Sequence, residues 1–390
     1  MSEFIKKMDI ACRILYGQKK QYLAEYIECN KRSLENIAAG KPYVLCTYYF
    51  PSEIAAMYDV EFIYIERIVG IAVSCGMVRG MENVALPNTI CSYHKAFWEL
   101  LERKVLPPPT MILGLAYPCM DARILCEKLH SLYGIPLIRI GEWDRRYPMK
   151  REEKEPGYEG LLRDCCNVLH KYFMQKQTIA ETVEYANQAV ALKKQIDEAR
   201  IQYPGILCSD EILKIFTVEN LYGRKEAIRV LRNLLTYIGE RKKQYKNSEK
   251  TRFFWMGLIP LYDNNMLSYI ENRYDCQFVY EEMWMFGDYY LEASTFYADM
   301  DKKIRGSLFY DLDERIRRLT DRMENLDVKA AIHFSQAHCS FLPPQIKEIE
   351  RALGKKNKTL YHLGADVVKG RFLREKLEEV VISCKEREGG

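Results

Sequence analysis

Residues 111–121 read MILGLAYPCMD, an apolar run that leads through a single cysteine, Cys119, into a polar and periodic stretch. The run at 111–116 has the length and composition of a buried strand. The residues at 121–132 have the apolar spacing of a helix. A strand followed directly by a helix is half of a βαβ unit, from which parallel sheets are built. This stretch therefore predicts an α/β fold.

The same alternation continues on both sides of this stretch. Helical patterns separate further strand-like runs, which occur at residues 43–49, 61–65, 135–140, 253–259, 277–280, 328–334 and 359–363. The helical patterns begin after Pro51 and lie at 91–103, before 270, at 345–353 and at 371–383. Strands that alternate with helices indicate parallel sheets.

The domain organisation follows from where this alternation is interrupted. A chain of 390 residues is too long for one ordinary core. We predict two Rossmann-like parallel-sheet domains joined by a helical segment, with an N-terminal helical extension. The expected boundaries are 1–40 for the extension, 41–154 for the first α/β domain, 155–247 for the helical bridge and 248–390 for the second α/β domain.

Charge and hydropathy exclude some classes of partner. The formal net charge is +4, from 58 basic and 54 acidic residues, which is too close to neutral to indicate nucleic-acid binding. No run approaches about 18 consecutive apolar residues, and the first residues contain no apolar core of signal-peptide length. We therefore expect a cytoplasmic protein without a membrane segment.

Three of the 13 cysteines stand at positions where core packing is not the first expectation. Cys119 and Cys339 each come just after an expected strand, and Cys91 opens an expected helix. In open parallel sheets, ligands bind beyond the carboxyl ends of the strands. Helix N-termini favour a thiolate, and thiolates select iron–sulfur clusters or zinc. Each cysteine alone also fits a buried structural role, since no C-x₂-C pair or ferredoxin spacing is present.

Five short segments, taken in order, carry a resemblance to a known family. They read FPSEI at 50–54, ICSYHK at 90–95, YPCMD at 117–121, QAHC at 336–339, and YHLGAD at 361–366, the last followed by Arg371 and REKLEE at 374–379. Over about residues 41–384 the chain resembles the 2-hydroxyacyl-CoA dehydratase and benzoyl-CoA reductase family. One departure is Met120, which separates Cys119 from Asp121 where the family usually has the acid directly after the cysteine.

The resemblance implies a cofactor and a reaction. Cys91, Cys119 and Cys339 would bind a [4Fe-4S] cluster with one iron left open. The enzyme would be a lyase that removes water from a (R)-2-hydroxyacyl-CoA through a ketyl radical. Other branches reduce aromatic rings, or reduce small molecules with a double-cubane [8Fe-9S] cluster. That larger cluster needs more thiolates, for which Cys46, Cys75 and Cys276 are candidates, although each also fits core packing.

The resemblance also implies partners. An ATP-hydrolysing iron–sulfur activator would deliver the electron, and a homologous subunit or a second copy of this chain would complete a dimer. The sequence has no Walker A motif and no G-x-G-x-x-G, so ATP is expected to be used by the partner. The chain could also be a non-catalytic partner subunit, or a zinc-binding or metal-free α/β binding protein with its cysteines in the core.

Several polar residues near these segments are candidate site residues. Glu53 and Ser52 follow the first strand and could act on substrate, while a first-turn Glu also stabilises a helix. His94 lies one turn after Cys91 and could donate to a cluster sulfur or to substrate. His338 adjoins Cys339 and could help to orient it without being a ligand itself. Tyr48 and Tyr49 could line the same pocket, although tyrosines of this kind commonly pack in the core.

Overall fold

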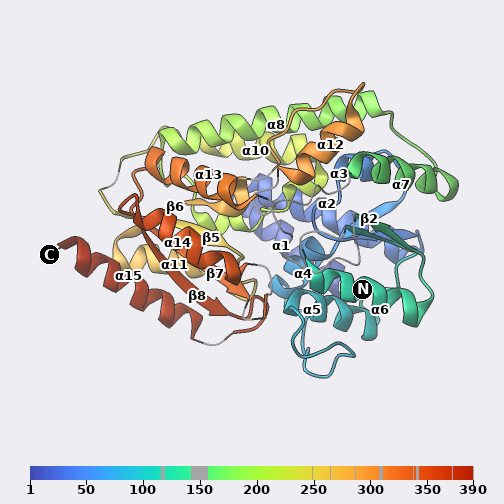
Figure 1. The fold of residues 1–390 in the computed structure, drawn as a ribbon, viewed down its shortest axis with the longest axis horizontal. Coiled ribbons are helices and arrows are strands. Elements are labelled where there is room, and N and C mark those ends of the chain that lie inside the picture. Colours follow the sequence, from blue (N-terminus) through green and yellow to red (C-terminus); the bar gives the residue numbers. More distant parts are fainter. Residues whose placement is uncertain are drawn as a thin grey trace.

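Two four-stranded parallel sheets with the same strand order organise the chain (Figure 1). The computed structural model describes residues 1–115, 119–141, 157–247, 249–263, 265–285, 287–306, 311–336, 338–339, 342–370 and 372–389. The first sheet has the order β2-β1-β3-β4, and its strands are β1 (Tyr43–Cys46), β2 (Glu61–Tyr64), β3 (Met111–Leu115) and β4 (Leu137–Ile140). The second has the order β6-β5-β7-β8, with β5 (Thr251–Gly257), β6 (Cys276–Glu281), β7 (Ala330–Gln336) and β8 (Thr359–Ala365). The predicted α/β class with two parallel sheets is confirmed.

Helices cover both faces of the first sheet because its strands are buried on both faces. Side chains alternate along β1: Tyr43 and Leu45 belong to one hydrophobic cluster, Val44 and Cys46 to another. The first cluster includes residues of α4 (Ile65–Ser74), α5 (Ser92–Glu102) and α6 (Met120–Tyr133). The second includes residues of α3 (Ser52–Ala56), α7 (Tyr158–Tyr172) and α12 (Phe296–Arg305).

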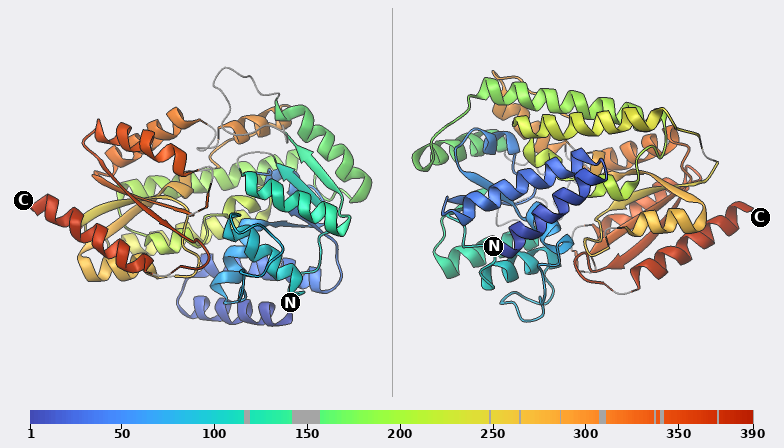
Figure 2. Two further views of the ribbon diagram at one scale, coloured as in Figure 1. Left: turned by 60° about the horizontal axis from the view of Figure 1, so that its bottom comes forward. Right: turned by 180° about the vertical axis from the view of Figure 1, so that it is seen from behind.

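The second sheet is also sandwiched between helices (Figure 2). One face is covered by α11 (Met266–Tyr274) and α15 (Leu373–Gly389), and the other by α13 (Leu312–Asn325) and α14 (Ile346–Gly354). Short 3₁₀ turns, η2 (Glu282–Met285) and η3 (Pro343–Gln345), follow β6 and precede α14.

Helices connect the two halves. The long helices α8 (Ile179–Gln202) and α10 (Lys225–Lys242) run side by side across the top of Figure 1, and α9 (Ser209–Leu213) and η1 (Val218–Leu221) lie between them in the sequence. A capping box starts α8, in which the Thr178 side chain accepts from the Glu181 N–H and Glu181 accepts from the Thr178 N–H. The N-terminal helices α1 (Ser2–Gly17) and α2 (Gln21–Ala38) pack on each other, and α2 packs on α10 (Figure 2, right).

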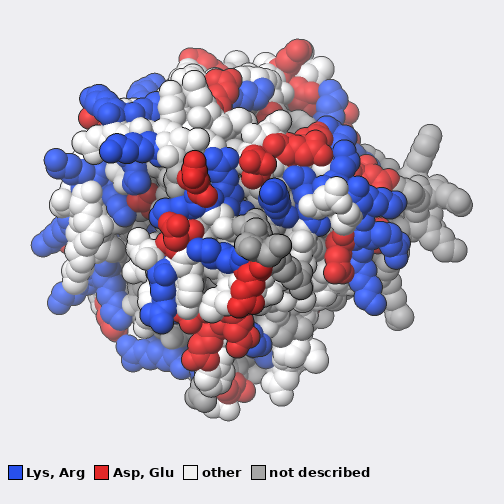
Figure 3. Space-filling model, turned by 90° about the vertical axis from the view of Figure 1, so that its left-hand side faces the viewer, with Lys and Arg blue, Asp and Glu red and all other residues white. Residues whose placement is uncertain are grey.

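No helix among the described residues is long and apolar enough to cross a membrane. On the face seen in Figure 3, acidic and basic side chains are mixed among the coloured residues.

Candidate functional site

The carboxyl ends of the central strands of both sheets meet at one pocket. Its lining includes Tyr48 after β1, Cys119 after β3, Leu258 after β5 and Cys339 after β7, and its volume is about 110 Å³. In each sheet the strand order reverses between these two strands, β1 and β3 in one and β5 and β7 in the other. Such switch points are where open α/β sheets bind ligands. Here the two switch points face the same cavity.

All three cysteines singled out from the sequence line this pocket. Cys91 is the N-cap residue of α5, Cys119 is the N-cap residue of α6, and Cys339 comes three residues before Leu342, which precedes η3. The amino ends of helices carry free N–H groups and a partial positive charge. This local geometry arises because each strand ends at the pocket and the next helix begins there.

Backbone N–H groups lie near the cysteine sulfurs. The N–H of Leu342 donates to the Cys339 Sγ at 3.4 Å. The backbone N–H groups of Tyr93 and Ala122 partly offset the rise in the pKa of Cys91 and Cys119. N–H groups placed in this way favour a thiolate.

Burial raises the pKa of the Cys91 and Cys119 thiols well above the ordinary cysteine value; the neighbouring thiols raise it further at Cys91, and Asp121 and Cys339 raise it further at Cys119. These two thiols therefore resist ionisation in the protein alone. A positively charged metal core reverses this effect and displaces the thiol protons. The soft donor set and its free N–H groups fit an iron–sulfur cluster.

The arrangement differs from a site for a single metal ion. In the part of the chain that the structure describes, no three His, Cys, Asp or Glu side chains are grouped closely enough to hold one ion.

Two polar side chains adjoin the cysteines. Asp121 Oδ2 accepts a hydrogen bond from the Cys91 N–H at 2.7 Å, which ties the start of α6 to the start of α5. His94 Nε2 lies 3.4 Å from the Cys119 Sγ. Burial lowers the pKa of His94 to about 4, so the imidazole is neutral at ordinary pH. The structure thus brings His94 to the cysteines, and Asp121 connects two cysteine segments despite the insertion of Met120.

Ser52 and Glu53 are directed elsewhere, Ser52 to a neighbouring cavity and Glu53 to Lys303 of that cavity's wall. Ser52 lines that cavity, and its Oγ donates to the Glu219 carbonyl oxygen at 2.7 Å. Glu53 is buried, and its Oε1 accepts from Lys303 Nζ at 2.7 Å. The chain turns away from the cysteines at Tyr49, which has a φ of 66°, before α3 begins. The structure therefore does not bring Ser52 or Glu53 to the three-cysteine pocket.

The other candidate residues also lie elsewhere. Cys46 is buried within β1, Cys75 lines a different cavity, and the Cys276 Sγ faces the Ile270 carbonyl oxygen at 3.9 Å. His338 is exposed and does not line the pocket. Four residues of the family-like segments lie outside the described residues, namely Tyr117, Pro118, Ala337 and Arg371.

Glu66 and Phe216 are among the residues of the pocket wall that the sequence did not single out. Burial raises the pKa of Glu66 to about 7, and its Oε2 has no hydrogen-bond partner among the described residues. The available signal was a single acid in the apolar run IYIERIV at 63–69. Phe216 comes from the helical bridge, and nothing local marks it as a pocket residue.

Comparison with models of protein families gives a match over most of the chain. A model of the 2-hydroxyglutaryl-CoA dehydratase D-component family matches residues 47–381, which include all three cysteines. No curated protein matches the chain. The match begins just after β1 and leaves both N-terminal helices outside it.

Proposed function

Because the chain belongs to the 2-hydroxyglutaryl-CoA dehydratase D-component family, we propose that it is the iron–sulfur subunit of a 2-hydroxyacyl-CoA dehydratase. In this proposal Cys91, Cys119 and Cys339 hold a [4Fe-4S] cluster, and the substrate is a (R)-2-hydroxyacyl-CoA. One observation carries it: three cysteines from distant segments line one pocket at the switch points of both sheets. The reaction class would be that of a lyase.

The residues around the cysteines have definable roles in this proposal. When bound, the cluster would supply low-potential electrons and an open Lewis-acidic iron. The N–H groups of Tyr93, Ala122 and Leu342 stabilise thiolate charge at the ligands. Asp121 orients the Cys91 segment, and His94 presents a neutral ring nitrogen to Cys119.

The wall of the three-cysteine pocket is largely apolar, which would limit the access of water to a bound centre. Leu258, Met283 and Phe216 are apolar members of this wall. Exclusion of water strengthens electrostatic interactions at the reacting atoms and protects a reduced centre from side reactions. A reduced iron–sulfur centre in such a pocket is suited to chemistry that oxygen and water would otherwise quench.

We also propose the partners. The sequence contains no phosphate-binding loop, which supports ATP hydrolysis by a separate iron–sulfur activator that delivers the electron. The name of the matching family denotes one component of a dehydratase, which supports assembly with a homologous subunit or a second copy of this chain.

A four-iron cluster is supported over a double cubane by the number of thiolates. Three of the 13 cysteines line the pocket, and all 13 are among the described residues. The three extra candidates, Cys46, Cys75 and Cys276, are directed elsewhere. The thiolates that a double cubane needs beyond three are therefore not gathered at the pocket.

Iron and sulfide analysis after anaerobic reconstitution tests the proposal. We expect about four iron atoms per chain and a brown protein with thiolate-to-iron absorption. Cys91→Ser, Cys119→Ser and Cys339→Ser should each lose most of the iron, whereas Cys75→Ser and Cys276→Ser should keep it. A colourless wild-type chain, or unchanged iron in the first three variants, contradicts the assignment.

A further inference from the structure

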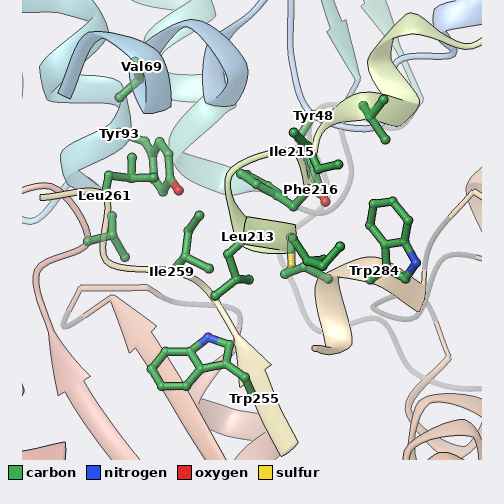
Figure 4. Packing of buried hydrophobic residues seen from close by; sticks show 14 of the residues in the cluster. Tyr48, Val69, Tyr93, Leu213, Ile215, Phe216, Trp255, Ile259, Leu261 and Trp284 are labelled. Carbon is green, nitrogen blue, oxygen red and sulfur yellow. The ribbon is translucent and has the colours of Figure 1, made fainter. Parts of the chain in front are cut away.

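A second and larger cavity adjoins the three-cysteine pocket. Its volume is about 300 Å³, at the lower end of the range in which proteins bind small ligands, about 300–1,000 Å³. Glu66 and Phe216 line both cavities, so they form the wall between them. Figure 4 shows Phe216 with Tyr48 and Tyr93 of the cysteine pocket and with Leu213 and Ile259 of the larger cavity.

The N-terminal helices build one side of this larger cavity. Ile14 and Leu15 come from α1, and Leu23 and Ile27 come from α2. The opposite side is formed by the segment after β5, which includes Leu261, and by α4. Both N-terminal helices lie outside the part of the chain that matches the family. The shape of this cavity therefore depends on residues that the matching segment does not contain.

The wall of this cavity is mainly apolar, and several of its polar groups are engaged elsewhere. Asp210 accepts from the N–H groups of Leu267 and Ser268 at 3.3 and 2.7 Å. Asp263 pairs with Arg374, with its Oδ2 2.6 Å from the Arg374 Nη2. These two carboxylates are satisfied without a ligand, so apolar side chains form most of the remaining binding surface, beside Glu66 and Lys214, which also line the cavity.

Arg67 and Thr217 are engaged in the same way. Arg67 donates to the Phe62 and Asn220 carbonyl oxygens at 3.2 and 3.4 Å. The Thr217 hydroxyl is hydrogen-bonded to the Tyr26 hydroxyl. Binding to a cavity of this kind is favourable chiefly because it removes apolar ligand surface from water.

We propose that this cavity binds the aliphatic chain of an acyl thioester whose reacting end lies in the three-cysteine pocket. The inference rests on the proposed function and adds the substrate class: a thioester with an extended apolar acyl group. The acyl chain would pass beside Phe216 and Glu66, the residues common to both cavities, and α1 and α2 would set the length that the cavity accepts. The N-terminal extension is then a specificity element.

Calorimetric titration of the purified full-length chain tests this assignment, using free CoA and straight-chain saturated acyl-CoA thioesters of increasing length. The affinity should rise about fourfold for each added methylene until the cavity is full, because each methylene leaves water. Free CoA should bind most weakly. Equal affinity for free CoA and all thioesters overturns the proposal, because the cavity would then take the CoA arm or no part of the ligand.

A cavity-filling variant locates the effect. Gly70 lines the cavity on α4, and a Cβ there would come 3.7 Å from the Leu261 Cδ2, an ordinary contact. Gly70→Leu should abolish the dependence on chain length while leaving free CoA binding unchanged. Gly239→Leu is the matched control, because Gly239 is an exposed helical glycine where an added Cβ would meet no atom within 4 Å. Unaltered chain-length dependence in Gly70→Leu overturns the proposal.

A second variant guards against a folding defect in the first. Ile14 lines the cavity on α1 and is 54% exposed, so Ile14→Trp can narrow the entrance with little effect on folding. It should weaken binding of the longest thioesters most. The titration needs no cluster, so it is independent of the iron analysis. If the chain binds iron but its affinity for acyl-CoA does not depend on chain length, only the acyl-chain inference is wrong. If the affinity depends on chain length but the chain binds no iron, only the cluster assignment is wrong.

Discussion

At the scale of single residues, Cys91, Cys119 and Cys126 occupy different local environments. Cys91 and Cys119 are the N-cap residues of α5 and α6 and line the pocket, whereas Cys126, about two turns further along α6, is fully buried in the core. The residue type is the same in all three places. A helix N-terminus supplies partial positive charge that favours a thiolate, and for this reason we propose Cys91 and Cys119, but not Cys126, as ligands.

Arg315 illustrates how strongly one buried charge can matter. Arg315 and Glu282 are both fully buried, with Nε–Oε1 and Nη2–Oε2 distances of 2.6 and 2.9 Å. Arg315→Ala leaves the Glu282 charge without its partner, and we expect a loss of about 3–5 kcal/mol in the free energy of unfolding, measured in urea. Arg317→Ala on the same helix removes an exposed arginine and should leave the free energy of unfolding nearly unchanged. Equal losses in the two variants would refute this explanation.

Residue roles were only partly predictable from the sequence. The three cysteines could be selected because each stands beside a predicted strand end or helix start. Ser52 and Glu53 satisfied the same rule, yet the positive φ of Tyr49 turns them toward η1 and Lys303. A backbone reversal at a bulky residue has no clear sequence signal. Glu66 lies on the pocket wall because α4 packs there, which local sequence does not reveal.

At the scale of elements, strand ends rather than strand cores were hard to predict. The apolar run at 43–49 predicted one strand, but β1 ends at Cys46. Thr47 continues to bond β3, since its N–H donates to the Leu113 carbonyl oxygen and its Oγ1 accepts from the Leu115 N–H. Tyr48 then lines the cysteine pocket. Aromatic residues that line a pocket look like strand residues in a sequence.

The end of β5 depends on a glycine. Gly257 has a φ of 75°, and a Cβ there would clash with the Phe334 carbonyl oxygen of the paired strand β7. Gly257→Ala should therefore combine backbone strain with a steric clash at the mouth of the site. Gly40→Ala is the control, because Gly40 has a similar φ of 86° but no atom within 4 Å of a Cβ.

The two glycine variants should differ in thermal and urea unfolding. We expect Gly40→Ala to cost about 1–2 kcal/mol from the left-handed conformation alone. Gly257→Ala should cost clearly more, and it should also lower the iron content, because Leu258 beside it lines the pocket. If the two variants lose the same free energy of unfolding, the close approach of β7 is not the reason that residue 257 must be glycine.

At the scale of the whole molecule, the two sheets share one hydrophobic cluster. It contains Leu45 and Ile112 of the first sheet together with Phe254 and Ile332 of the second. A continuous core couples the stability of both halves. The alternation of strands and helices could predict two sheets, but not their shared core, because that depends on how α2, α9 and η1 fill the space between them.

This coupling predicts a cooperative response to one core substitution. Ile332→Ala removes buried side-chain volume in β7, and we expect the chain to lose about 2–5 kcal/mol. Native-state hydrogen exchange should show the same loss of protection in peptides covering β3 and β7. Ile382→Ala, at a position that is 41% exposed, should leave both the free energy of unfolding and the exchange protection unchanged. Loss confined to the second sheet would indicate two independently unfolding halves.

The meeting of three distant cysteine segments is the central claim, and no sequence spacing could establish it. Diffraction from crystals grown anaerobically after reconstitution, recorded on both sides of the iron absorption edge, tests it most directly. We predict one compact anomalous peak within bonding distance of the Cys91, Cys119 and Cys339 sulfur atoms. Iron bound at other residues, or no iron peak between these three sulfurs in a reconstituted crystal, would contradict the account.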